Sequence, residues 1–170
     1  LEQKIDALDS MHANQHIPQI LGAMELFKAT GEKKYYELSE FFWQTVVSSH
    51  CYANGGIGEG EMFHKSGKIG ALLDKDTAET CASYNMLKLT KELYQLSPKA
   101  SYMDYYERTL INHILASQDQ RVTGESTYFL PLGPGMKREF LFENSCCHGT
   151  GMESRFKYRE GIYFFDEKGS

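Results

Sequence analysis

The chain has 170 residues, 41% of them hydrophobic, and a formal net charge of −5 at pH 7. These values predict a single globular domain, and the 18 scattered lysines and arginines do not form the basic stripe of a nucleic-acid-binding surface. No apolar run approaches the ~20 residues that cross a membrane, so neither a nucleic acid nor a membrane is an expected partner.

Apolar residues recur at helical spacing over most of the first two thirds of the chain. This period predicts a helix that Asn14 caps and that ends near residue 30, then a second helix up to about residue 49 after a very short connection. It also predicts helices over about 77–96 and 100–117. Trp43 lies off the apolar stripe of its helix and is expected to face another one. The chain is therefore expected to be mainly α, with two helical hairpins in succession.

The stretch between the two hairpins is rich in glycine, with five glycines from residue 55 to residue 67. Such a loop is able to wrap around a site. Glu61 stands in it between a glycine and two apolar residues, a setting that suits a general acid. Glu59 is equally available, and a solvated loop carboxylate is the alternative interpretation.

The last third of the chain has a different character. Two short aromatic-rich runs, 126–132 and 137–142, flank Gly133-Pro134-Gly135 and predict a β-hairpin. A short helix over about 151–158 and a strand-like run over 161–165 follow. The hairpin is expected to bring the segment between residues 142 and 151 to one end of the helices.

That segment holds the adjacent pair Cys146 and Cys147, half of the chain's four cysteines. Neighbouring cysteines rarely bond to each other because the ring would be strained, and the chain has no C-x-x-C pair. The cysteines therefore indicate reduced thiols or thiols held by a metal. Gly149 and Gly151 allow close approach of the backbone, and the start of a helix favours a thiolate. The alternative is a loop with one buried and one exposed thiol.

Glu79 and Cys81 place a carboxylate and a thiol in the first turn of the third predicted helix. With Cys146 and Cys147 they make a set of three sulfurs and one oxygen, which suits a tetrahedral zinc ion. The alternative for Glu79 is structural, because Asp76 three residues earlier predicts a capping box with Glu79 at its N3 position.

Several histidines are candidates for a site. His12 and His16 lie about one helical turn apart, close enough to share a ligand, and surface imidazoles are the alternative. The same two interpretations apply to His64 and His148.

Six motifs, taken together in their order and spacing, are far more specific than any one of them. They are HAN-x-x-IP at 12–18, GGIG with GEMF at 55–63, ETCASYNM at 79–86, YYERTLIN at 105–112, TYFLPL at 127–132 and CCHGTGMES at 146–154. In this series the chain resembles, nearly from end to end, the bacterial β-L-arabinofuranosidases of glycoside hydrolase families 127 and 146. It departs from the family motif at position 16, which is His where Gln is expected.

The resemblance implies an (α/α)6 barrel, a ring of helical hairpins with the site at one end, followed by β-sandwich modules. Twelve helices of about 15 residues with their loops need roughly 300 residues, so residues 1–170 are expected to be the later part of such a barrel. The small β-hairpin is expected next to the site. The earlier helices and the β-sandwich modules are expected outside this chain.

Carried over position by position, the resemblance also implies roles for individual residues. The implied zinc ligands are Glu79, Cys81, Cys146 and Cys147. The implied nucleophile is Cys146, and the implied acid/base is Glu61. The implied sugar-contacting residues are His12, Glu107 and Tyr128.

The expected protein is a retaining glycoside hydrolase that releases L-arabinofuranose from β-linked arabinofuranosides, with Zn²⁺ as cofactor and a glycoside as partner. The Cys146 sulfur is expected to attack the anomeric carbon while Glu61 protonates the departing oxygen, and water then cleaves the thioglycosyl intermediate. Two alternatives stay open: a non-catalytic protein with a structural zinc site, and a related glycosidase for another sugar. The sequence leaves open a homo-oligomer, and a cytoplasmic, periplasmic or secreted location.

Overall fold

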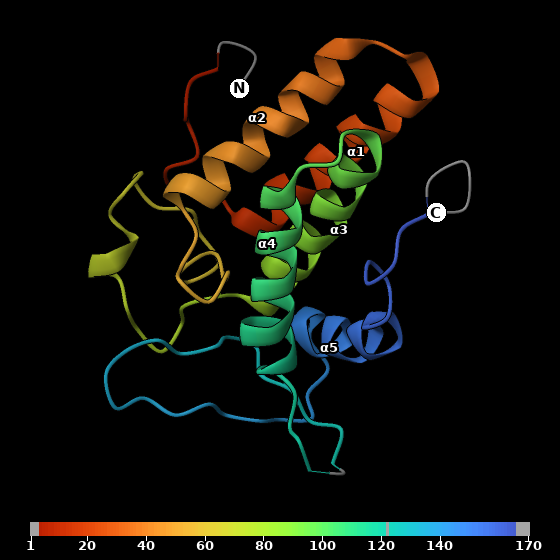
Figure 1. The fold of residues 1–170 in the computed structure, drawn as a ribbon. Helices are drawn as coiled ribbons and strands as arrows, with labels where there is room; N and C mark the ends of the chain where they lie inside the picture. The colour runs from red at the N-terminus through yellow and green to blue at the C-terminus, as the bar shows by residue number, and fades with distance from the viewer. Residues whose placement is uncertain (1–3, 122, 166–170) are drawn as a thin grey trace.

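The computed structural model describes residues 4–121 and 123–165, and it is mainly helical (Figure 1). Within these residues, β structure is limited to isolated bridges. The elements in chain order are α1 (Ala13–Thr30), α2 (Lys33–Ser49), the 3-10 helix η1 (Ile69–Ala71), α3 (Thr80–Leu96), α4 (Ala100–Thr109), the π-helical turn η2 (Leu110–Leu115) and α5 (Cys146–Lys157). None of the described helices combines the length and the apolar character that crossing a membrane requires.

The helix α3 is the centre of the structure. The helices α1 and α2 form one hairpin, and α3 and α4 with η2 form a second, which confirms the two predicted hairpins (Figure 1). Because α3 packs against α1, α2, α4 and α5, ten of its 17 residues are buried. The burial is continuous in its first turn, where Thr80 to Tyr84 are all buried.

Trp43 joins the two hairpins, as its position off the apolar stripe predicted. Its indole Nε1 donates a hydrogen bond of 2.8 Å to the Thr90 hydroxyl of α3, and its ring meets Tyr102 of α4 edge-on with centroids 4.6 Å apart. A buried indole needs a partner for its N–H, and Thr90 supplies it without breaking the apolar packing.

The predicted cap of α1 is wrong. His12 is the N-cap residue, and its side chain makes no capping hydrogen bond. The Asn14 side chain lies in the first turn and instead accepts a 2.8 Å hydrogen bond from Asn85 of α3. The Asn14 side chain therefore bonds to a residue of another helix instead of capping its own. The predicted fourth helix is also divided, because regular α-helix ends at Thr109 and η2 continues it.

The predicted β-hairpin is also wrong. Only one antiparallel bridge, between Ser126 and Leu141, joins its two runs. The amides of the first run instead bond to other segments: Thr127 N donates to Ser117 O at 2.9 Å and Leu130 N to Ala78 O at 3.1 Å. The run 126–132 therefore lies along the entry to α3, and 137–142 remains a loop.

Two further predictions near the C-terminus are corrected. The run 161–165 is not a strand. The helix expected over 151–158 begins earlier, so that Cys146 and Cys147 are its first two residues rather than part of a preceding loop. The serine before them caps the helix, which moves its start upstream of the two glycines.

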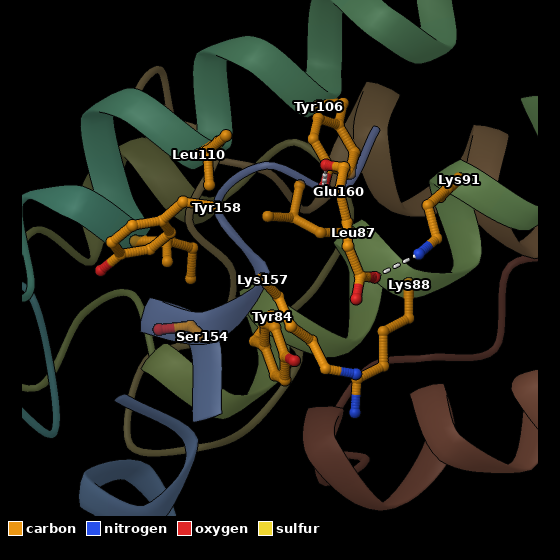
Figure 2. A pocket seen from close by; sticks show the side chains of 11 residues that line it. Tyr84, Leu87, Lys88, Lys91, Tyr106, Leu110, Ser154, Lys157, Tyr158 and Glu160 are labelled. Carbon is orange, nitrogen blue, oxygen red and sulfur yellow. Dashed lines mark hydrogen bonds and ion pairs between the residues drawn. The ribbon is translucent and has the colours of Figure 1, made fainter. Parts of the chain in front are cut away.

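Figure 2 shows how the end of α5 is fixed to the second hairpin. A cavity of about 50 Å³ lies between α3, α4, η2 and α5. Across it, Lys91 of α3 makes a 2.6 Å ion pair with Glu160, and the Tyr106 hydroxyl donates to the Glu160 carbonyl at 2.8 Å. These contacts join the segment just after α5 to both α3 and α4.

The glycine-rich loop rests directly on α4. The Tyr105 hydroxyl donates to the carbonyl of Gly55 at 3.1 Å, and Gly55 has a φ of +88°, which glycine adopts without strain. A Cβ at this residue would lie 2.8 Å from the Cα of Thr109, closer than packed atoms approach. Gly55 thus permits the loop to touch the helix backbone.

Replacing Gly55 with alanine is expected to lower the free energy of unfolding by more than about 3 kcal/mol, because backbone strain and overlap with Thr109 add. Gly31→Ala is the matched control: its φ is +73° but no atom lies within 4 Å of the added Cβ. Strain alone should cost about 1 kcal/mol there. Urea unfolding of both variants measures the difference, and equal losses would mean that the loop does not rest on α4.

Candidate active site

Four potential metal ligands that are far apart in the sequence meet where α5 crosses the start of α3. One ligand atom from each of four side chains lies within 4.8 Å of all the others; the residues are Glu79, Cys81, Cys146 and Cys147. They come from the first turn of α3 and the first turn of α5, which pack against each other. The structure thus brings together the four residues implied by the family resemblance.

The entry to α3 directs Glu79 towards this cluster. Glu79 is the N-cap residue, not the N3 residue of a box begun by Asp76, so the capping alternative is wrong. Its amide donates to Ile57 O at 3.0 Å, and its side chain makes no capping bond. The Glu79 carboxylate is therefore available as a ligand atom of the cluster. Cys81 follows in the first turn, buried, with its sulfur 3.1 Å from the Thr150 hydroxyl of α5.

The two cysteines at the start of α5 differ in their exposure to solvent. Ser145 caps the helix by accepting from His148 N, and its hydroxyl lies 2.6 Å from His148 Nδ1. Cys147 is buried, with its sulfur 3.9 Å from Glu79 Oε1, whereas Cys146 is exposed. One thiol is therefore enclosed among the ligands while its neighbour is open to a reactant.

The cluster fits a bound zinc ion. Glu79 Oε2 is buried and has no hydrogen-bond partner in the described residues, which leaves one ligand atom unused. Sulfurs bound at about 2.3 Å around a tetrahedral zinc lie about 3.8 Å apart, so the ligands need to contract by about 1 Å. Three sulfurs and one carboxylate oxygen are donors that zinc accepts.

The electrostatics of the cluster favour a cation. Burial raises the pKa of Glu79 to about 8, and the negative charge of Cys81 adds to this. A hydrogen bond from Cys147 lowers the pKa of Cys81 to about 7, while the same pairing and burial raise the pKa of Cys147 above its usual range. The groups compete for protons because their negative charges are close together, and a divalent cation removes that conflict.

Glu61 is presented on a tight turn beside the cluster. Glu59 and Met62 pair in both directions, at 3.2 and 3.0 Å, around Gly60 and Glu61, whose φ angles are +53° and +69°. Two positive φ values define a type I′ turn, and a glutamate in that conformation is strained. The Glu61 carbonyl accepts from Ala13 N at 2.8 Å, which fixes the turn to the start of α1.

Tyr128 connects Glu61 to Cys146. Its hydroxyl donates to Glu61 Oε1 and lies 3.3 Å from the Cys146 sulfur. His12 Nε2 lies 3.4 Å from the other carboxylate oxygen of Glu61. A carboxyl group, a phenol and an exposed thiol are thus in direct succession, with an imidazole behind the carboxyl group.

The remaining candidates lie elsewhere. Glu107 is exposed on α4, and no hydrogen bond or ion pair in the described residues joins it to the cluster or to Glu61. Glu59 Oε2 lies 2.9 Å from His64 Nε2 and so has a partner of its own. His16 Nδ1 contacts the His12 carbonyl at 2.9 Å, one turn back on the same helix.

Sequence reasoning missed two residues that support the site. Thr150 contacts the Cys81 sulfur, and Ser145 both caps α5 and holds the His148 ring. A serine directly before the two cysteines was a capping signal that placed them inside a helix. No local signal identified Thr150, because its partner belongs to another helix.

Comparison with known proteins decides the family. Residues 1–160 match the family model described as the beta-L-arabinofuranosidase GH127 catalytic domain. The chain belongs to this family. Over 100 residues, this GH127 chain is 30% identical to the non-reducing end beta-L-arabinofuranosidase of Bifidobacterium longum subsp. longum. That match covers 56% of the chain and 15% of the relative.

Two solved structures share the fold of this GH127 chain. The GH127 beta-arabinofuranosidase BT3674 is 26% identical, with a TM-score of 0.73 over 85% of the chain and 23% of that structure. Ara127N-Se, a GH127 beta-L-arabinofuranosidase from Geobacillus stearothermophilus T6, is 23% identical, with a TM-score of 0.73 over 89% of the chain and 26% of that structure. The chain therefore spans only about a quarter of the solved structures that it matches.

Proposed function

We propose that this GH127 chain forms part of the catalytic centre of a retaining glycoside hydrolase that releases L-arabinofuranose from β-linked arabinofuranosides. The observation that carries the proposal is the contact series Cys146, Tyr128, Glu61, which lies beside the four-ligand cluster. In the same proposal, the two hairpins belong to the later part of an (α/α)6 barrel. The rest of the ring and the β-sandwich modules are supplied by residues beyond these 170.

The reaction needs a nucleophile and an acid on opposite sides of the anomeric carbon. The ionised Cys146 sulfur attacks that carbon and forms a C–S bond, while the C–O bond breaks and Glu61 gives its proton to the departing oxygen. Glu61, now a carboxylate, takes a proton from water. The water oxygen then bonds to the anomeric carbon as the C–S bond breaks, which restores the thiolate and the protonated acid.

Tyr128 and His12 position these two groups. The Tyr128 hydroxyl carries one proton, which it donates to Glu61 in this structure while its oxygen contacts the Cys146 sulfur. The phenol therefore sets the spacing between acid and nucleophile, and His12 fixes the second carboxylate oxygen. We also propose that His12, Glu107 and Tyr128 contact the sugar.

Zn²⁺ is the proposed cofactor, held by the cluster of Glu79, Cys81, Cys146 and Cys147. When bound, it supplies the positive charge that keeps these thiols ionised at neutral pH. Glu79, Cys81 and Cys147 anchor the site from buried positions, and Cys146 alone is exposed towards the substrate.

Removing one ligand without touching the reacting atoms tests the metal. Glu79→Gln is expected to weaken zinc binding at least about 100-fold and to lower activity in parallel at limiting zinc, because the amide is a poorer ligand than the carboxylate. The control Glu59→Gln should keep the zinc affinity and the activity of the wild type. Zinc content by plasma mass spectrometry and turnover of an aryl arabinofuranoside, measured on the protein that carries this chain, check the result. Full activity in metal-free protein would contradict it.

Zinc content and turnover of a panel of aryl glycosides separate this function from the two alternatives. A protein with a purely structural zinc site binds the metal but turns over no glycoside. A related glycosidase for another sugar cleaves a different aryl glycoside in a panel, with the same dependence on Cys146 and Glu61.

A further inference from the structure

A cavity of about 180 Å³ opens beside Tyr128, the residue that contacts both the proposed acid and the proposed nucleophile. Its wall includes Asp76, Phe129, Glu139, Glu143 and His148. Three segments that are distant in sequence thus enclose it: the end of the glycine-rich loop, the run 126–132 with the loop after it, and the first turn of α5. Of the residues that line it, only Tyr128 has a role in the function proposed above.

His148 contributes a buried imidazole to the wall of the cavity. His148 is only 6% exposed, and its Nδ1 is taken by the Ser145 hydroxyl at 2.6 Å. Its Nε2 is buried and has no hydrogen-bond partner among the described residues. Leaving a buried ring nitrogen unpaired is unfavourable, so a ligand hydroxyl that bonds to Nε2 is stabilised there.

The charges on the wall favour a neutral ligand over an anion. Two lysines, Lys75 and Lys137, face three carboxylates, and Lys75 already makes a 2.8 Å ion pair with Asp76. The rings of Tyr128 and Phe129 lie 4.8 Å apart at a tilt of 47°. Carboxylates that accept hydroxyl protons beside an aromatic face are the chemistry of a sugar site.

The cavity also lies next to the turn that carries the proposed acid. Asp76, in its wall, accepts a 3.0 Å hydrogen bond from Gly60 N through its carbonyl, so the cavity borders the turn that carries Glu61. Glu61 protonates the departing oxygen, and the group attached to that oxygen must lie on the same side. His148 also lines a larger cavity of about 460 Å³, but Tyr128 does not, which places that space further from the bond.

We propose that this cavity is the subsite for the sugar unit on the leaving-group side of the bond, with His148 Nε2 hydrogen-bonded to one of its hydroxyls. The inference rests on the proposed glycosidase function. It adds a subsite that would let the protein distinguish an oligosaccharide from a simple glycoside. His148 is a specificity-determining residue in this proposal, and it takes no part in bond cleavage.

A matched pair of substitutions isolates the Nε2 contact. In His148→Asn, the amide nitrogen takes the place of Nδ1 towards Ser145, and nothing replaces Nε2. In His148→Gln, the longer side chain carries its amide nitrogen to the place of Nε2. Each variant is compared with wild type on a β-linked arabinofuranose disaccharide and on the methyl arabinofuranoside, whose leaving group is too small to fill the cavity.

His148→Asn is expected to lower kcat/KM for the disaccharide about tenfold more than for the methyl glycoside, which is the effect of one lost hydrogen bond. His148→Gln should stay within about threefold of wild type on both substrates. Equal losses on both substrates, or no loss on either, would overturn the subsite, and zinc content monitors the neighbouring ligands. Wild-type protein that cleaves neither substrate would instead refute the glycosidase function itself.

Discussion

Replacing Cys146 with alanine is expected to lower kcat on an arabinofuranoside at least about 10⁴-fold, because it removes the atom that we propose forms the covalent intermediate. Cys146 is the exposed first residue of α5, so the change leaves no buried cavity and the helix keeps its serine cap. Three ligands of the cluster remain. Added zinc should therefore not restore turnover, whereas it should restore a variant whose only defect is weak metal binding.

The control for this loss is Cys51→Ala, which removes a thiol outside the cluster and should leave kcat within about threefold of wild type. Mass spectrometry of rapidly quenched wild-type protein should find one pentosyl group on the peptide that contains Cys146. A Cys146→Ala protein that still forms a covalent adduct, or that keeps more than a tenth of wild-type turnover, would remove Cys146 from the mechanism.

The helices were predictable because the information for them is local. Apolar residues at helical spacing mark the buried faces of α1 to α4, and the position of Trp43 correctly indicated contact with a second hairpin. The caps were not predictable to the same degree. Asn14 and Asp76 are both residue types that often cap helices. In the structure, however, the Asn14 side chain bonds to Asn85 of α3, and the Asp76 carbonyl accepts from Gly60 N.

The run 126–132 failed as a hairpin strand for a related reason. Its aromatic and β-branched residues are compatible with any extended neighbour, and strand propensity does not specify which one. In the structure its amides bond to Ser117 and Ala78, both distant in sequence. This placement also carries the Tyr128 carbonyl to Thr80 N at the start of α3, and it brings the Tyr128 hydroxyl between Glu61 and Cys146.

The site residues were predicted from the resemblance, since their spacing alone left each of them with an ordinary alternative. No local pattern brings Glu79 to Cys147, because their contact depends on α3 packing against α5. The strained φ of Glu61 was equally hidden from the sequence. A glutamate held where glycine or asparagine is preferred indicates a function that offsets the strain, and this agrees with its proposed role as acid.

Glu61→Gln is expected to lower kcat/KM about 10²- to 10⁴-fold for a substrate with a sugar leaving group, because an alkoxide departs only if it is protonated. The loss should shrink to about tenfold or less when the leaving group is an acidic phenol, which departs as an anion without help. Glutamine keeps the shape of the side chain and an oxygen that accepts from Tyr128, so the strained turn and the spacing to Cys146 are preserved.

The dependence on leaving group separates acid catalysis from a structural defect. A series of aryl arabinofuranosides with phenols of increasing acidity gives the slope of log kcat/KM against leaving-group pKa, which should steepen in Glu61→Gln relative to wild type. Glu59→Gln, two residues away and paired with His64, is the control and should keep the wild-type slope. An equal loss of kcat/KM for every phenol in the series would mean that Glu61 does not donate the proton. Another residue would then have to be the acid.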